Sequence, residues 1–115
     1  MSINRHEQSK VFSKVVEANG FVFTSGIVAD DVSQDVNGQT RQVLAEIDRL
    51  LGLGGTDKSK IISAMIWVTD IRNRDAMNEA WFEWTGGQNM PVRACVEARL
   101  ATPEMLVEIQ VTAAK

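Results

Sequence analysis

The stretch Met90-Pro91-Val92-Arg93-Ala94-Cys95-Val96-Glu97-Ala98-Arg99-Leu100 alternates strictly between apolar and polar residues from position 92 onward. The even-numbered positions are Val, Ala, Val, Ala and Leu, whereas the odd-numbered positions are Arg, Cys, Glu and Arg. This period of two is typical of a strand with one buried and one polar face. We therefore expect the even-numbered row to face the core.

A second strand is predicted next, because Met105–Thr112 alternates in the same way after residues 101–104. A four-residue loop would place Leu100 opposite Met105 in an antiparallel hairpin, and Glu97 opposite Glu108. In that register the two polar rows share one face of the sheet. We therefore expect one polar surface, which carries Arg93, Cys95, Glu97, Arg99, Glu108 and Gln110.

The size and charge of the chain limit its possible functions. Its 115 residues, 44% apolar and 23% charged, predict one domain over residues 1–115, with residues 1–9 as a mobile tail. A net charge of -3 without a basic run argues against a nucleic-acid partner. The chain has no bilayer-length apolar run and no signal-peptide core, and its single cysteine excludes an internal disulfide. These features predict a cytoplasmic protein without a membrane partner.

The first half of the chain predicts a hairpin followed by a helix. Asn19-Gly20 accepts the positive φ angles of a tight turn, so Lys10–Ala18 and Phe21–Ser25 should pair. An apolar stripe predicts a helix from about Val36 to Leu53. Three residues could cap its N-terminus, namely Asp31, Ser33 and Asp35.

The second half begins with Ile61–Thr69, which is apolar on both faces and should be buried on both sides. Because the predicted helices cover only one face, we expect another subunit to cover the other. A second helix, capped by Asp70 or Asn73, should run to Thr85 and pack Met77, Trp81 and Trp84 on the sheet. The order ββαβαββ predicts an α+β fold, a mixed sheet with two helices on one face.

Three segments together resemble the Rid family, the reactive intermediate deaminases, over a match from about Val11 to Ala113. The segments are Phe23-Thr24-Ser25-Gly26, Pro91-Val92-Arg93-Ala94-Cys95-Val96 and Val107-Glu108-Ile109. The resemblance implies a chorismate-mutase-like fold and a homotrimer whose sheets form a central barrel, with ligand clefts between subunits. It also implies hydrolysis of enamine or imine intermediates, including 2-imino acids, to 2-keto acids and ammonia.

The resemblance also implies roles for individual residues. Arg93 matches the arginine that holds the substrate carboxylate, and Glu108 matches the acidic residue that places the water. Cys95 matches a cleft cysteine, and Ser25 and Gly26 match a cleft-lining turn.

The chain departs from the family pattern at two positions. Phe12, within Val11-Phe12-Ser13, stands where the family usually carries Gly-Pro-Tyr, so the tyrosine hydroxyl is lost. Ile27 stands where glutamine often follows Ser-Gly. Both changes resemble divergent Rid subfamilies.

The proposed chemistry needs no metal and no organic cofactor, and His6 as the only histidine offers no metal-ligand cluster. Arg93 is suited to bind a carboxylate, because a guanidinium donates two parallel hydrogen bonds. Glu108 is suited to accept a proton from a water molecule or to orient it. On its residue type alone, Arg93 would be a solvated or ion-paired surface residue and Cys95 a small buried filler. A non-catalytic module that binds small carboxylate metabolites fits the same residues, and a ribonuclease ranks last.

Overall fold

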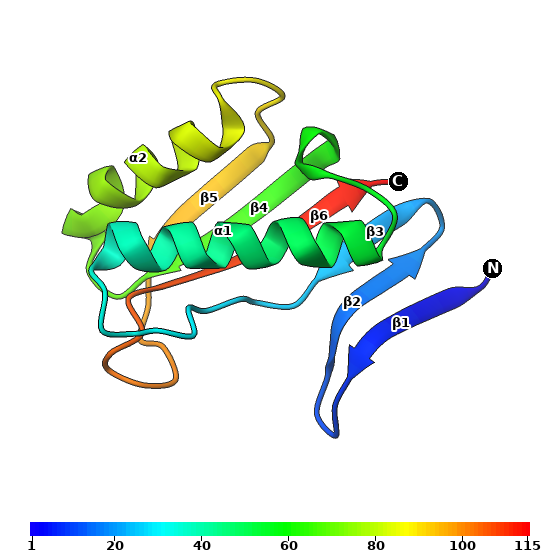
Figure 1. Ribbon diagram of the computed structural model, residues 1–115, viewed down its shortest axis with the longest axis horizontal. Helices are drawn as coiled ribbons and strands as arrows, with labels where there is room; N and C mark the ends of the chain where they lie inside the picture. The colour runs from blue at the N-terminus through cyan, green and yellow to red at the C-terminus, as the bar shows by residue number, and fades with distance from the viewer.

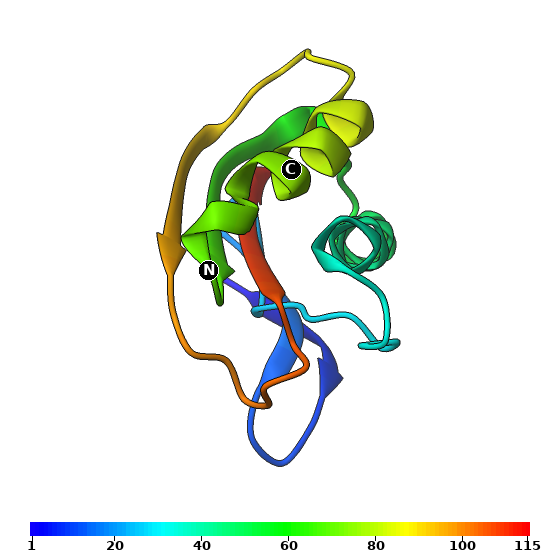
Figure 2. The same cartoon turned by 90° about the vertical axis from the view of Figure 1, so that its left-hand side faces the viewer.

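Two helices cover one face of a six-stranded mixed sheet in the computed structural model, which describes residues 1–115 (Figure 1). Figure 2 shows both helices on the same side of the sheet, so the other side is open. The predicted α+β class, with two helices on one face of a mixed sheet, is confirmed. The strands are β1 (Ile3–Gln8), β2 (Ser13–Ala18), β3 (Phe21–Thr24), β4 (Ile61–Val68), β5 (Val92–Glu97) and β6 (Val107–Ala114), in the spatial order β1-β2-β3-β6-β4-β5. The helices are α1 (Val36–Leu53) and α2 (Arg74–Thr85), with short 3-10 turns η1 (Lys58–Lys60) and η2 (Ile71–Asn73).

The N-terminal residues differ from the prediction, because residues 3–8 form β1 rather than a mobile tail. This strand pairs antiparallel with β2, from Ile3 opposite Ala18 to Gln8 opposite Ser13. The polar side chains of residues 3–8 gave no sign of a strand, which forms because its backbone pairs with that of β2. The predicted order ββαβαββ is therefore confirmed from Ser13 onward, and the structure adds one strand, β1, before it. The Asn19-Gly20 turn is confirmed, with φ angles of 51° and 81°.

The predicted C-terminal hairpin is wrong, because β4 lies between β5 and β6. Arg93 of β5 stands opposite Ala64 in a parallel pair, and Gln110 of β6 stands opposite Met65 in an antiparallel pair. The alternation continues to Leu100, but β5 ends at Glu97, which leaves residues 98–106 as a connection long enough to pass β4. The strand that is apolar on both faces thus takes an inner position, where neighbours on both edges satisfy its backbone.

The two rows of β5 also face the opposite way from the prediction. Cys95 lies opposite Ile66, which is fully buried under the helices, and packs against the core. Val92 and Val96 lie on the open face and are 72% and 39% exposed. The alternation is real, but β5 is an edge strand, and within one chain no helix covers its apolar row.

The core lies between the sheet and the helices, as the apolar stripes require. The side chain of Asp35 accepts a 2.9 Å hydrogen bond from the Gly38 N–H and caps α1, which settles the choice of cap. Helix α2 buries Met77 and Trp81 in this core and ends at Gly86, whose φ is 65°. Neither helix combines the length and apolar character needed to cross a membrane. The buried residues of α1 are Val36, Gln39, Thr40, Val43, Leu44, Ile47, Leu50 and Leu51.

Candidate functional site

Three of the predicted site residues line one cavity of about 210 Å³. These residues are Phe12, Ser25 and Gly26, which come from the turn before β2 and the segment after β3. A larger cavity of about 620 Å³, along residues 97–103 and Thr69, contains none of the predicted site residues. The remaining lining of the smaller cavity consists of Lys14, Ile27, Val28, Asp30, Gln42 and Glu46.

A serine-centred turn positions Phe12. The Ser9 hydroxyl oxygen accepts hydrogen bonds from the Val11 and Phe12 N–H groups at 3.1 and 3.2 Å. The Ser9 N–H in turn donates to the Phe12 carbonyl at 2.8 Å. Such local hydrogen bonds are why serine favours turns, and here they hold Phe12 at the start of β2.

Ser25 is held by its backbone and leaves its side chain free. Its N–H donates to the Lys14 carbonyl at 2.9 Å, and the preceding Thr24 hydroxyl donates to the Ser25 carbonyl at 2.9 Å. The Ser25 Oγ is buried and has no hydrogen-bond partner in the protein. Most buried polar atoms are paired, so an unpaired hydroxyl in a cavity lining is suited to bind a ligand.

The Glu108 carboxylate lies directly against Gly26. A Cβ atom at Gly26 would stand 2.1 Å from Glu108 Oε2, so only glycine permits this approach. The next residues are fixed by two backbone hydrogen bonds, between Ile27 and Ile109 in both directions, at 2.8 and 3.0 Å. Glu108 is half-buried and forms no ion pair within the chain. The fold therefore presents a free carboxylate beside the Ser25–Gly26 turn.

Arg93 and Cys95 lie elsewhere, on edge strand β5 and toward helix α2. The Arg93 guanidinium carbon lies 5.4 Å from the Trp81 ring centroid, a cation–π distance. Cys95 is half-buried, and burial raises the pKa of its thiol, a shift that the nearby Arg93 and Arg74 oppose. A thiol with a raised pKa is a poor nucleophile at neutral pH.

The single polar surface predicted for Arg93, Cys95 and Glu108 is therefore wrong. Arg93 stands opposite Ala64, whose side chain is buried under the helices, whereas Glu108 stands opposite Trp67 on the open face. Opposed residues share a face, and successive residues of β4 alternate between faces. The error follows from the false hairpin, which had placed both polar rows in one register. Glu97 also pairs differently, because its carboxylate accepts from the Ile71 N–H at 3.0 Å.

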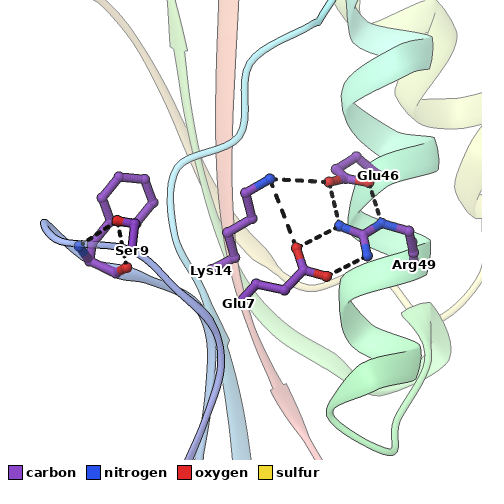
Figure 3. Close-up of polar contacts among 6 residues, drawn as sticks. Glu7, Ser9, Lys14, Glu46 and Arg49 are labelled. Carbon is purple, nitrogen blue, oxygen red and sulfur yellow. Dashed lines mark hydrogen bonds and ion pairs between the residues drawn. The ribbon is translucent and has the colours of Figure 1, made fainter.

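Four charged residues form a group next to the cavity that no sequence pattern predicted. Lys14 and Glu46 line the cavity, and with Glu7 and Arg49 they join the β1–β2 hairpin to α1 (Figure 3). The i, i+3 spacing of Glu46 and Arg49 is visible in the sequence. The contact between Arg49 and Glu7, which are 42 positions apart, has no local signal.

Comparison with known proteins agrees with the resemblance seen in the sequence. The family model described as Endoribonuclease L-PSP matches residues 2–115. A RutC family protein of Haemophilus ducreyi is 44% identical over 112 residues, which cover 97% of this chain and 96% of the relative.

Solved structures give the same result. NMB1025 of Neisseria meningitidis, a member of the YjgF protein family, has a TM-score of 0.96 at 42% identity, covering 100% of this chain and 96% of that one. YyfA of Yersinia pestis, of the conserved Rid protein family, has a TM-score of 0.87 at 33% identity, covering 94% and 90% of the two chains. With its fold, its Ser25–Gly26 turn and these matches over nearly its full length, the chain belongs to the YjgF/RutC/Rid family, the one that the L-PSP model describes.

Proposed function

We propose that this protein hydrolyses small 2-imino acids to 2-keto acids and ammonia, without a cofactor, in clefts between subunits. The observation that carries the proposal is the free Glu108 carboxylate against Gly26, a residue that lines, together with Ser25 and its unpaired hydroxyl, a cavity of about 210 Å³. A carboxylate can accept a proton from water, and a cavity of this size suits a small substrate. Membership of the family supports the same reaction class.

The proposed site needs two copies of the chain. Arg93 and Glu108 point to opposite faces of one sheet, so one chain cannot bring both to the same small substrate. Apolar side chains on the open face favour association, because apolar surface gains by leaving water. The family resemblance supports a trimer as the assembly, and a solution mass near one chain under native conditions would contradict it. The exposed apolar residues of this face are Phe21, Phe23, Val92 and Val96.

Each group has a distinct part in the proposed reaction. The Arg93 guanidinium of one subunit holds the substrate carboxylate through paired hydrogen bonds, and Trp81 supports its plane. Glu108 of the next subunit takes a proton from a water molecule as that water attacks the imine carbon. That proton passes to the imine nitrogen, which gives the carbinolamine. Glu108 then accepts the hydroxyl proton of the carbinolamine and transfers it to the nitrogen as the carbon–nitrogen bond breaks, so that the keto acid and ammonia are released. Cys95 contributes packing beside Arg93 rather than a nucleophile.

Mixed assemblies of two inactive variants test this proposal. Glu108→Gln and Arg93→Ala should each abolish imine hydrolysis, measured as keto-acid and ammonia release above the spontaneous rate. When the two variants are unfolded and refolded together, about a quarter of the wild-type activity should return, because half of the chains carry each intact group. The active clefts of the mixture are those that receive an intact Arg93 from one chain and an intact Glu108 from the neighbouring chain.

A second mixture provides the control. Glu108→Gln mixed with Ser25→Ala should give no activity above the mean of the separate variants, because both changes affect the same side of the proposed cleft. No recovery in the first mixture would overturn the shared site. Binding of a 2-keto acid to the wild type without any imine hydrolysis would favour the alternative function, a non-catalytic module that binds small carboxylates.

A further inference from the structure

Arg49 joins Glu7 to Glu46 (Figure 3), and Glu46 lines the cavity that contains Ser25 and Gly26. Arg49 donates to both carboxylate oxygens of Glu7, at 2.6 and 2.9 Å, from β1. It also donates to both carboxylate oxygens of Glu46, at 2.7 and 2.8 Å, from its own helix α1. Because these bonds are bidentate, Arg49 fixes the geometry of both glutamates.

Lys14 is the fourth member of this group and is bound much less tightly. Its Nζ lies 3.9 Å from Glu7 Oε1 and 3.8 Å from Glu46 Oε2, beyond hydrogen-bond distance. Its side chain is 43% exposed and lines the cavity. The charges of the four residues cancel, yet the N–H donors of Lys14 remain unused within the protein.

The backbone at Glu7 indicates that this arrangement is held under strain. Glu7 has a φ of 51°, in the left-handed region that non-glycine residues adopt at a cost. Strained residues persist where the surroundings fix them, and they gather at functional sites. Here Glu7 is held by two ion pairs, with Arg49 and with Lys14 of the cavity lining.

Lys14 is also adjacent to the proposed reaction site. Its carbonyl accepts the Ser25 N–H at 2.9 Å, so the two residues are neighbours across β2 and the end of β3. The nearby Gln42 amide is held by Asp31, because its oxygen accepts the Asp31 N–H and one of its N–H groups donates to the Asp31 carbonyl. Lys14 is the one cation of the cavity lining, and its N–H groups make no hydrogen bond within the protein, although its ammonium is ion-paired with Glu7 and Glu46.

We propose that Lys14 binds a second acidic group on the substrate, so that the site prefers 2-imino dicarboxylic acids to imino acids with apolar side chains. This inference rests on the proposed function and assigns its substrate class. Arg93 of the neighbouring subunit holds the carboxylate next to the imine. Lys14 holds the distal carboxylate, while Arg49 takes the hydrogen bonds of Glu7 and Glu46 and leaves Lys14 only the longer ion pairs to them.

Paired substrates test the inference. The imines derived from glutamate and from 2-aminobutyrate, formed in the assay by an amino-acid oxidase, differ in the distal carboxylate. For Lys14→Met, kcat/KM for the diacid should fall by about tenfold or more, the value of one charge-assisted hydrogen bond. The value for the monoacid should change by less than about twofold. Lys60→Met, an exposed lysine outside the cavity, should leave both values unchanged.

Three results would overturn the inference. Equal losses with both imines would mean that Lys14 only supports the fold. A wild-type preference for a basic imino acid would mean that Asp30 of the cavity lining, and not Lys14, binds the distal group of the substrate. If no imine is hydrolysed at all, the proposed function fails, and calorimetric titration with 2-oxoglutarate and 2-oxobutyrate decides the role of Lys14 separately. Equal affinity of wild type and Lys14→Met for 2-oxoglutarate would then overturn it.

Discussion

Glu108 and Gly26 are in such close contact that a single methyl group between them would displace the carboxylate. The space is filled by Oε2, at 2.1 Å from the position of a Cβ, and by the carboxyl carbon at 2.9 Å. Both atoms belong to the mobile end of a side chain, so a bulkier residue at position 26 would move Glu108 rather than the backbone. The glycine therefore governs where the proposed base lies.

Gly26→Ala should reduce imine hydrolysis strongly while leaving the fold nearly intact. The new methyl group forces the Glu108 carboxylate to another rotamer, and a displacement of about 1 Å can cost roughly a hundredfold in rate. The matched control is Gly52→Ala, since a Cβ there meets nothing within 4 Å. The control should keep full activity and gain a little stability from its helical alanine. An active Gly26→Ala enzyme would contradict the role of Glu108.

Arg93→Ala should abolish keto-acid binding with only a small loss of stability. Losing two charge-assisted hydrogen bonds, each about 1.5–3 kcal/mol, should weaken affinity by about a hundredfold or more. Losing the stack on Trp81 should cost the fold about 0.5–1 kcal/mol. Arg93→Lys should rescue binding poorly, because an ammonium lacks the planar pair of donors. Thermal midpoint and keto-acid titration are the two measurements, and a lowered midpoint with unchanged affinity would defeat the assignment.

Features with local causes were predictable from the sequence. The apolar stripe of α1, the Asn19-Gly20 turn and the end of α2 at Thr85 all depend on neighbouring residues, and all three were confirmed. The position of β5 was not predictable in this way. Alternation defines two rows of side chains, but it does not say which row meets the helices or which strand lies alongside.

The site was only partly predictable for the same reason. Family motifs led to Ser25, Gly26 and Glu108, which the fold brings close together. The motif arginine lies on the other face of the sheet, because β5 pairs with β4 and not with β6, in a register that places Arg93 opposite Ala64. Lys14 had no motif, and it reaches the cavity through the packing of a hairpin on a helix far away in sequence.

Cys95→Ser should keep most of the imine hydrolase activity. The thiol packs against the core, and burial raises its pKa, so it is protonated at neutral pH. Alkylation of Cys95 in the folded protein should accordingly begin at a higher pH than alkylation of a free cysteine peptide. The measurements are kcat/KM of the variant and the pH dependence of iodoacetamide labelling. A loss as complete as that of Arg93→Ala would show that sulfur takes part in the reaction.

Acid should weaken the attachment of the β1–β2 hairpin to α1. Hydrogen bonds from Arg49 lower the pKa of Glu7 and of Glu46, because they favour the charged carboxylates. A carboxylate with a lowered folded-state pKa stabilises the protein above its unfolded pKa and loses that effect as pH falls through the folded value. Arg49→Met should therefore be less stable than wild type at pH 7, and the difference should shrink below about pH 4. Arg99→Met, at an exposed arginine without an ion pair, provides the control in parallel thermal melts. A difference that stays constant from neutral to acid pH would show that Arg49 acts through packing and not through the two carboxylates.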